Sequence, residues 1–364
     1  MRYDYLITGA GITGTTIARI LAEAGERVLV VDKLNHIGGN CFDEYDEHGI
    51  LIHKYGPHIF HTNHKEVWDF LSRFTEWWPY HHRVRAYVDG KILPFPINLD
   101  TINRLYNLTL EPNQMADYLD SVKVKIDTIS NSEDSIVSRI GTDLYEKFFK
   151  NYTLKQWGVP AEKLHPSVCE RIPIRLNRDD RYFTDRYLGM PLKGYTELFK
   201  KMLSHNNINI MLDTGYADVS RDIKYKGLVY TGPIDEYFDY CYGRLGYRSL
   251  RFYFKNIKKV SFQECAVINY PNSYDFTRIT EYKKLTGQKS DSTTVSYEYP
   301  RDRGDPYYPM PTTENAQLYE KYYKETKKLE DVVFAGRLGA YRYMNIDAAC
   351  LEGMKAAKGL LNGK

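Results

Sequence analysis

The sequence predicts an α/β fold interrupted by two inserts, one helical and one an antiparallel sheet, and three observations lead to this prediction. The first 32 residues combine two short apolar runs with a glycine-rich turn and a helical pattern between them. Apolar residues then recur at every fourth position over residues 136–148, which is typical of a buried helix face. Residues 249–254, 266–270 and 293–299 alternate apolar and polar side chains, which indicates strands.

The composition excludes several classes of protein. A chain of 364 residues predicts about two domains at roughly 150 residues each. The 50 basic and 47 acidic residues leave a net charge of +3, too small for us to expect nucleic acid as a partner. No segment reaches about 18 apolar residues, so we expect no membrane span and a soluble, cytoplasmic protein. The five cysteines are scattered without a CxxC pair, and we expect neither disulfides nor a metal site.

The glycine-rich turn at residues 9–14 has the pattern GxGxxG of a dinucleotide-binding, Rossmann-like domain. In that fold Gly9 permits a tight turn, Gly11 lets the backbone approach a pyrophosphate, and Gly14 lets the helix pack on the strand. A carboxylate that ends the second strand, here Asp32, reaches the adenosine ribose. In this part of the chain we expect the cofactor to contact Gly9, Gly11, Ile12, Thr13, Gly14, Asp32 and Lys33.

Two further segments indicate which dinucleotide is bound. Gly39 and Asn40 belong to a Gly-Gly loop shortly after the second strand, which resembles flavoproteins of the glutathione-reductase-like FAD class. A strand at residues 332–334 and a helix from about residue 347 to 361 enclose Gly336 and Arg337, and we expect Arg337 near the FAD diphosphate. No second GxGxxG follows, so the chain has no evident docking site for NAD(P)H.

The two inserts divide the chain into three predicted domains. The FAD-binding domain takes residues 1–78, 190–240 and 326–364. The helical domain takes residues 98–165, and the antiparallel sheet domain takes residues 79–97, 166–189 and 241–325.

Eight sequence blocks carry a resemblance that covers the chain from end to end. In chain order they are YGPHIFH (55–61), YTLKQWG (152–158), RIPIR (171–175), YFTDR (182–186), YTGPID (230–235), FTRITE (276–281), YYP (307–309) and GRLGAYRY (336–343). Together they resemble the bacterial UDP-galactopyranose mutases. The resemblance implies a redox-neutral isomerase that interconverts UDP-galactopyranose and UDP-galactofuranose through a covalent adduct between the anomeric carbon and N5 of reduced FAD.

The same resemblance implies several partners and a cellular role. It implies a UDP-sugar substrate, an external reductant such as NAD(P)H, a homodimer, and a role in cell-surface polysaccharide biosynthesis.

The resemblance also implies roles for individual residues. Arg171, on a mobile loop, and Arg278 would clamp the diphosphate, and the catalytic set would be Arg171, Arg278, His58 and His61. The substrate would contact Phe148, Phe149, Tyr152, Thr153, Trp157, Tyr182, Asn269, Tyr308, Tyr343 and His82. Tyr152 would stack on the uracil. The cofactor would further contact His58, Ile59, Tyr343, Met344, Asn345 and Ile346. For Phe148 a place in the core is an equal alternative.

Two residues depart from the pattern of the family. Asn345 stands where an aspartate is common, and His82 stands where an asparagine is common. These changes leave open a related sugar such as UDP-N-acetylgalactopyranose. Two different functions are open as well: a FAD-dependent oxidase of amines or polyenes, and a non-catalytic protein that binds flavin or nucleotide sugars.

Overall fold

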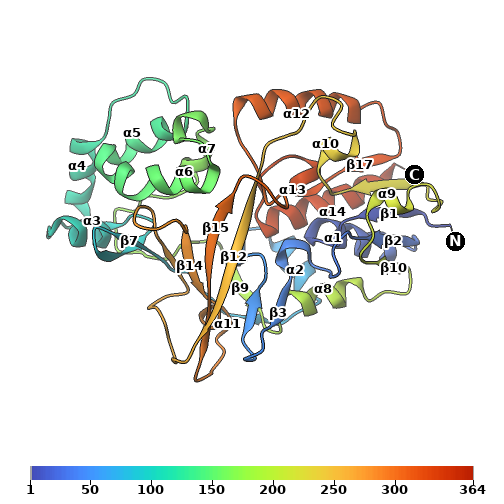
Figure 1. Cartoon of the computed structure of the whole chain (residues 1–364), viewed down its shortest axis with the longest axis horizontal. Coiled ribbons are helices and arrows are strands. Elements are labelled where there is room, and N and C mark those ends of the chain that lie inside the picture. The colour runs from blue at the N-terminus through green and yellow to red at the C-terminus, as the bar shows by residue number, and fades with distance from the viewer. Residues whose placement is uncertain (1, 364) are drawn as a thin grey trace.

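The computed structural model describes residues 2–363 and has three parts, which Figure 1 shows side by side. A five-stranded sheet with its helices carries both chain ends, a helical cluster lies at the opposite end of the molecule, and a long twisted sheet runs between them. The predicted α/β fold is therefore confirmed. Within the described residues, no helix combines the length and the apolar character needed to cross a bilayer. The predicted domain boundaries stay a prediction.

Within residues 2–363 this first sheet has five strands, and all four pairs in it are parallel. Their order is β10 (Ile208–Met211), β2 (Val28–Val31), β1 (Tyr5–Thr8), β11 (Gly227–Tyr230) and β17 (Val332–Phe334). The main helices around it are α1 (Ile12–Glu23), α8 (Tyr195–Leu203), α12 (Thr313–Thr326) and α14 (Ile346–Asn362), and the short ones are α9 (Tyr216–Val219), α10 (Ile234–Tyr237) and α13 (Gly336–Gly339). Apolar side chains of β1, β2 and α1 form one buried core here, as expected for a parallel sheet covered by helices.

Helix α1 begins earlier than the sequence pattern predicts. Helical spacing of apolar residues is evident in the sequence from Thr15 onward, whereas the helix begins at Ile12 with the extended residue Gly11 as its N-cap. Of the last two glycines of the motif, Gly11 is thus the N-cap and Gly14 lies inside the helix. The turn residue Gly9 has a φ of +102°, which glycine adopts without strain.

The second sheet has seven strands and continues beneath the helical cluster. Their order is β16 (Tyr308–Pro309), β12 (Tyr247–Ile257), β15 (Thr293–Arg301), β14 (Arg278–Glu281), β13 (Val267–Asn269), β7 (Val84–Val88) and β8 (Lys91–Phe95). The predicted antiparallel pairing holds for every neighbouring pair except β7 and β13, which run parallel. These two strands come from distant parts of the chain, and periodicity within one strand carries no information on the direction of its neighbour.

The helical cluster carries the apolar stripe that the sequence indicated. It comprises α3 (Leu99–Tyr106), α4 (Pro112–Val122), α5 (Ser132–Tyr145), α6 (Asn151–Trp157) and α7 (Ser167–Glu170). A π-helical turn, Glu146–Lys150, joins α5 to α6. The remaining elements are α2 (Lys65–Ser72), α11 (Lys283–Thr286), the hairpin β3 (Asp43–Tyr45) with β4 (Leu51–His53), and the small sheet of β5 (Phe60–Thr62), β9 (Tyr187–Pro191) and β6 (Trp77–Trp78).

Candidate active site

Two adjoining cavities lie where the three parts of the molecule meet. One has a volume of about 400 Å³ and is lined from the helical cluster and the seven-stranded sheet. The other, about 690 Å³, lies at the carboxyl ends of β1, β2 and β11, where open α/β sheets bind their ligands. Five residues line both cavities: Tyr55, His58, Arg337, Asn345 and Ile346. The two cavities therefore adjoin at these five residues.

The larger cavity, which we call the cofactor cavity, contains nearly all of the residues predicted to bind FAD. Its lining includes Gly9, Gly11, Ile12, Thr13, Gly14, Asp32, Lys33, Gly39, Asn40, His58, Gly336, Arg337, Met344, Asn345 and Ile346. The other two, Ile59 and Tyr343, line only the smaller cavity. Four tyrosines that were not predicted to bind the cofactor also line this cavity: Tyr216, Tyr230, Tyr237 and Tyr240.

The lining of the cofactor cavity fits a dinucleotide such as FAD. A Cβ built on Gly11 would lie no closer to any atom than 3.9 Å, at Gly39 Cα, so this wall is formed by bare backbone. Helices α1 and α14 both begin at this cavity, at Gly11 and Asn345, and neither has a side-chain cap. Their first N–H groups are thus available to phosphate oxygens, and the helix dipoles favour negative charge there.

Asp32 is held in place by its own backbone surroundings. Its Oδ2 accepts a hydrogen bond from Ala10 N at 2.7 Å, and its Oδ1 accepts one from Leu34 N at 2.9 Å. The carboxylate therefore joins the glycine-rich turn to the end of β2. An oxygen of a carboxylate has more than one acceptor site, so this arrangement leaves acceptor capacity for ribose hydroxyls.

The smaller cavity, which we call the substrate cavity, is lined by every residue predicted to contact substrate. Phe148, Phe149, Tyr152, Thr153 and Trp157 come from the π turn and α6; Asn269 and Arg278 from β13 and β14; and His82, Arg171, Tyr182, Tyr308 and Tyr343 from loops and strand ends. His61, from β5, lines it too. Phe148 and Phe149 are also buried members of the main core, so for Phe148 a place in the core and a place in the site do not exclude each other.

Positive charge dominates the polar part of the substrate cavity. Arg278 Nε donates to Glu298 Oε2 at 2.8 Å, and Glu298 is only 1% exposed. The two terminal nitrogens of Arg278 donate to no residue within 2–363. The guanidinium of Arg171 lies 4.5 Å from the ring centre of Tyr343. Together with Arg337, these groups can hold an anion through forked, charge-assisted hydrogen bonds.

The pKa values of the tyrosines in the substrate cavity are shifted in two directions. Burial raises the pKa of Tyr308 to about 12 and also raises the pKa of Tyr182. Burial raises the pKa of Tyr343 as well, but the guanidiniums of Arg171 and Arg337 outweigh it and lower that pKa below its usual value. A hydroxyl polarised in this way is a good hydrogen-bond donor to a phosphate oxygen.

Arg337 fixes the wall between the two cavities. It donates to the carbonyl oxygens of Tyr307 at 3.1 Å and of Met344 at 2.6 Å. Its guanidinium lies 5.3 Å from the ring centre of Tyr308 and 5.2 Å from that of Tyr343. This arginine thus presents its charge to both cavities while its position is set by two backbone carbonyls.

His58 is neutral near pH 7. Burial lowers the pKa of His58 to about 3, and neighbouring His53 contributes in the same direction. His58 Nδ1 lies 2.9 Å from the Gly56 carbonyl oxygen, which can only accept, so this nitrogen carries the proton. The Nε2 atom of His58 is therefore an acceptor at the border of the two cavities.

We expect the folded protein to lose stability as the pH falls below about 6.5, the pKa of an unperturbed histidine. Burial lowers the pKa of His53 to about 4 and that of His82 to about 3. In the unfolded chain both imidazoles bind protons below pH 6.5, while in the folded chain they do not. Each of these two histidines then lowers the free energy of unfolding by about 1.4 kcal/mol for every pH unit below 6.5.

Guanidinium unfolding of the FAD-loaded protein between pH 7 and pH 4.5 measures this loss. His53→Gln is the matched variant, because glutamine can still accept the hydrogen bond that His58 N donates to His53 Nδ1. We expect a shallower pH dependence in this variant, and an identical slope in both proteins would contradict the prediction.

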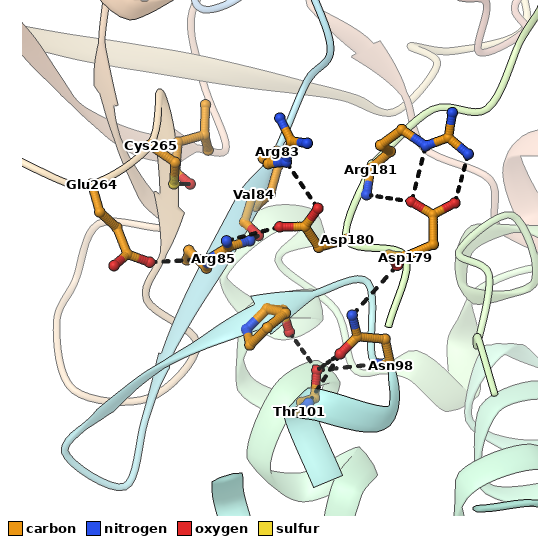
Figure 2. Close-up of polar contacts among 12 residues, drawn as sticks. Arg83, Val84, Arg85, Asn98, Thr101, Asp179, Asp180, Arg181, Glu264 and Cys265 are labelled. Atoms are coloured by element: carbon orange, nitrogen blue, oxygen red, sulfur yellow. Dashed lines mark hydrogen bonds and ion pairs between the residues drawn. The ribbon is translucent and has the colours of Figure 1, made fainter. Parts of the chain in front are cut away.

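Residues 171–186 form the segment that carries Arg171 and Tyr182. The ion pairs of Asp180 with Arg83 and Arg85, which we call the ionic clasp, attach this segment to the seven-stranded sheet. Figure 2 shows the Asp180 carboxylate between Arg85 of β7 and Arg83, which directly precedes β7. The carboxylate accepts from Arg83 Nε at 2.8 Å and from Arg85 Nη2 at 2.9 Å. Arg85 also pairs with Glu264 at 2.9 Å. The Tyr182 N–H adds a backbone hydrogen bond to the carbonyl oxygen of His82, at 2.7 Å.

Arg175 takes part in the same arrangement. Its side chain is half-buried and donates to the carbonyl oxygens of Asp179 and Arg181 inside the segment.

Asp180→Asn is expected to loosen this segment. The change removes two partly exposed ion pairs that together contribute about 1 kcal/mol, or about a fivefold change in the fraction of open segment. Limited trypsin digestion after Arg178 and Arg181 measures that fraction directly. Glu264→Gln is the control, because it removes a partner of Arg85 but keeps the contact to the segment. Equal cleavage of Asp180→Asn and wild type would show that the clasp does not hold the segment.

Several residues of the substrate cavity were absent from the sequence prediction. Phe183 and Gln156 line it, and Glu298 pairs with Arg278 from the adjacent strand. Phe183 and Gln156 lie inside the YFTDR and YTLKQWG blocks, so the blocks themselves were the available signal. Glu298 occupies an ordinary position in an alternating strand, which offers no such signal.

Comparison with known proteins places these features in context. The model of the UDP-galactopyranose mutase family matches residues 147–343, and that of the NAD(P)-binding Rossmann-like domain matches residues 7–74. A probable UDP-galactopyranose mutase of Klebsiella pneumoniae is 40% identical over 99% of this chain and 95% of its own length. A dTDP-fucopyranose mutase of Escherichia coli is 38% identical over 97% of both chains. A crystal structure of reduced UDP-galactopyranose mutase superposes with a TM-score of 0.82 at 17% identity, covering 100% of this chain and 95% of that one.

Proposed function

Since the chain belongs to the UDP-galactopyranose mutase family, we propose that it interconverts UDP-galactopyranose and UDP-galactofuranose with FAD in the cofactor cavity. The chain is thus an enzyme, an isomerase of the mutase type. The observation that carries the proposal is the adjacency of the two cavities, which share His58, Arg337 and Asn345. A sugar held in one cavity would meet the flavin held in the other.

The chemistry that reduced FAD supplies when bound is a nucleophilic N5 that displaces UDP from the anomeric carbon of the sugar, with no net oxidation. The glycine-rich turn, Asp32 and the first turns of α1 and α14 would hold the cofactor. Gly11 and Gly39 bring bare backbone against it. Arg337 would lie beside its diphosphate, in agreement with its place between the cavities.

The residues of the substrate cavity bind, orient and enclose the nucleotide sugar. Arg171 and Arg278 would neutralise the diphosphate from two elements, a loop and a strand, and so hold the leaving group close to the carbon it departs from and later returns to. Tyr182, Tyr308 and Tyr343 have hydroxyl groups that can donate to the same oxygens. Tyr152 and the buried Phe149 offer flat apolar surface for the base.

A further part of the proposal concerns partners. We propose that an external reductant such as NAD(P)H keeps the flavin reduced, and that the enzyme works as a cytoplasmic homodimer whose product enters cell-surface polysaccharide. Light scattering of the purified protein gives the oligomeric state.

The test is turnover of UDP-galactofuranose by the purified yellow protein with and without dithionite, followed by separation of the two UDP-sugars. We expect conversion only with dithionite. Turnover that ignores flavin reduction would contradict the mechanism, and flavin and UDP binding without conversion would contradict the activity. Oxygen consumption with an amine would identify an oxidase instead.

Assays with two further nucleotide sugars test which sugar the enzyme prefers. The relative from Escherichia coli bears the name dTDP-fucopyranose mutase, and the departures at His82 and Asn345 raise UDP-N-acetylgalactopyranose as an alternative. Both are therefore assayed beside UDP-galactopyranose, and we expect the highest kcat/KM for UDP-galactopyranose.

A further inference from the structure

His61 is held in the substrate cavity by contacts on one edge and one face. The ring is 8% exposed and stacks on Phe183, with ring centres 3.6 Å apart and planes inclined by 13°. Its Nδ1 lies 3.0 Å from Asp185 Oδ2. The other nitrogen, Nε2, has no hydrogen-bond partner within the described part of the chain, so it is available to a ligand in the cavity.

Asp185 is itself fixed by the strand that follows it and by a neighbouring loop. Its Oδ1 accepts from Asn63 Nδ2 at 2.9 Å, and Asn63 Oδ1 in turn accepts from Arg186 N at 2.9 Å. These residues flank the pairing of β5 with β9, in which His61 lies opposite Leu188. The carboxylate therefore has little freedom to turn away from the imidazole.

We propose that Asp185 is a positioning residue for the mutase reaction: it fixes the tautomer and orientation of His61 so that Nε2 accepts a hydrogen bond from a hydroxyl of the bound hexose. This inference rests on the proposed function. An ionised carboxylate only accepts hydrogen bonds, so of the two neutral tautomers of His61 it selects the one with the proton on Nδ1 and a lone pair on Nε2. A second-layer carboxylate that orients a histidine in this manner is a common way to hold an imidazole ready.

The position of His61 favours the sugar as its ligand. His61 follows His58 by three residues in one block, and His58 lines both cavities. The end of the substrate cavity nearest the cofactor is the end where the reacting sugar must lie.

His82 provides a contrast, and its ring centre lies 6.1 Å from that of Phe183. Its Nδ1 contacts the hydroxyl of Tyr80 at 3.0 Å, and a hydroxyl can either donate or accept. Of these two histidines, only His61 thus has its tautomer dictated by its partner.

The first readout is the nitrogen NMR spectrum of the FAD-loaded protein labelled with ¹⁵N-histidine, in which His61→Gln identifies the signals of His61. We expect the wild type to show a protonated Nδ1 and a bare Nε2, and Asp185→Asn to populate the opposite tautomer. Asn63→Ala is the matched control: it removes the other contact of the carboxylate but keeps the bond to His61, and it should leave the tautomer unchanged. An unchanged tautomer in Asp185→Asn would overturn the proposal.

The second readout is a double-mutant cycle in the reduced enzyme. We expect Asp185→Asn to lower kcat/KM for the UDP-sugar about tenfold, the loss of one hydrogen bond to a charged group. The double variant should be no worse than His61→Gln alone, because Asp185 acts through His61. Additive losses would mean a merely structural role and would overturn the proposal.

The affinity for UDP separates this inference from the proposed function. UDP lacks the hexose, so its affinity should be the same in wild type and Asp185→Asn. A UDP affinity that falls as much as that of the UDP-sugar would place His61 away from the sugar and overturn the inference. A wild type that binds UDP-sugar but never converts it would contradict the proposed function, while the tautomer and affinity readouts still decide the inference.

Discussion

Arg278→Ala is expected to lower kcat/KM for the UDP-sugar by about a thousandfold while the purified protein keeps its flavin. The terminal nitrogens of this guanidinium have no partner among the described residues and point their charge at a cavity that would hold a diphosphate. Loss of a charged partner in an enclosed site costs about 4 kcal/mol, which corresponds to about a thousandfold in rate. Steady-state kinetics with dithionite and a visible spectrum of the same sample measure both quantities.

Glu298 makes the simple alanine variant hard to interpret, because it is left without its partner. An unpaired carboxylate that is 1% exposed costs several kcal/mol, so Arg278→Ala can lose activity by unfolding. The double variant Arg278→Ala/Glu298→Gln removes the stranded charge. We expect it to recover most of the thermal stability and none of the activity, and recovered activity would show that Arg278 acts only by pairing with Glu298.

Arg171→Ala tests the other half of the clamp without that complication. Arg171 is exposed to the cavity and contacts the ring of Tyr343 rather than a carboxylate. We therefore expect a similar loss of kcat/KM with no loss of stability. Arg181→Ala is the control from the same segment, since its side chain pairs with Asp179 and lies outside the cavity lining. Wild-type turnover in Arg171→Ala would mean that the diphosphate clamp has been placed wrongly.

The parts of the fold that the sequence predicts best are those determined over short distances along the chain. Strand, glycine turn, helix and strand follow one another within residues 5–31, and each glycine has a local task that its spacing reveals. The parallel pairing of β7 with β13 is different, because Val84 and Val267 meet through tertiary folding alone. The periodicity within a strand does not indicate which strand will pair with it.

The same distinction applies to the candidate site. Arg278 could be selected from its sequence block, whereas Glu298 could not, although the two side chains form one ion pair. Glu298 reaches Arg278 because β14 and β15 are neighbours in register, with these two residues directly opposite. Asp185 likewise meets His61 only through the pairing of β5 with β9. Asp185 lies inside the YFTDR block, but its contact with His61, like that of Glu298 with Arg278, depends on the register between strands.

Gly14→Ala is expected to abolish both cofactor binding and stable folding, and Gly11→Ala only the first. A Cβ on Gly14 would lie 2.0 Å from the carbonyl oxygen of Gly9, and backbone cannot give way as a side chain does. Overpacking of this kind costs about 3 kcal/mol or more and separates α1 from the turn. A Cβ on Gly11 meets no protein atom within ordinary contact distance except Gly39 Cα at 3.9 Å, so we expect a folded protein.

Cofactor affinity should nevertheless fall in Gly11→Ala, because the new methyl group occupies the wall that a pyrophosphate must approach. Flavin absorbance per protein and thermal unfolding separate the two effects, with Gly359→Ala as control. Gly359 lies in α14 with nothing within 4 Å of its added Cβ, so alanine there should raise stability by about 0.5–1 kcal/mol and leave flavin content unchanged. A yellow, fully active Gly11→Ala protein would show that the diphosphate does not pass this turn, and the assignment of the cofactor cavity would fail with it.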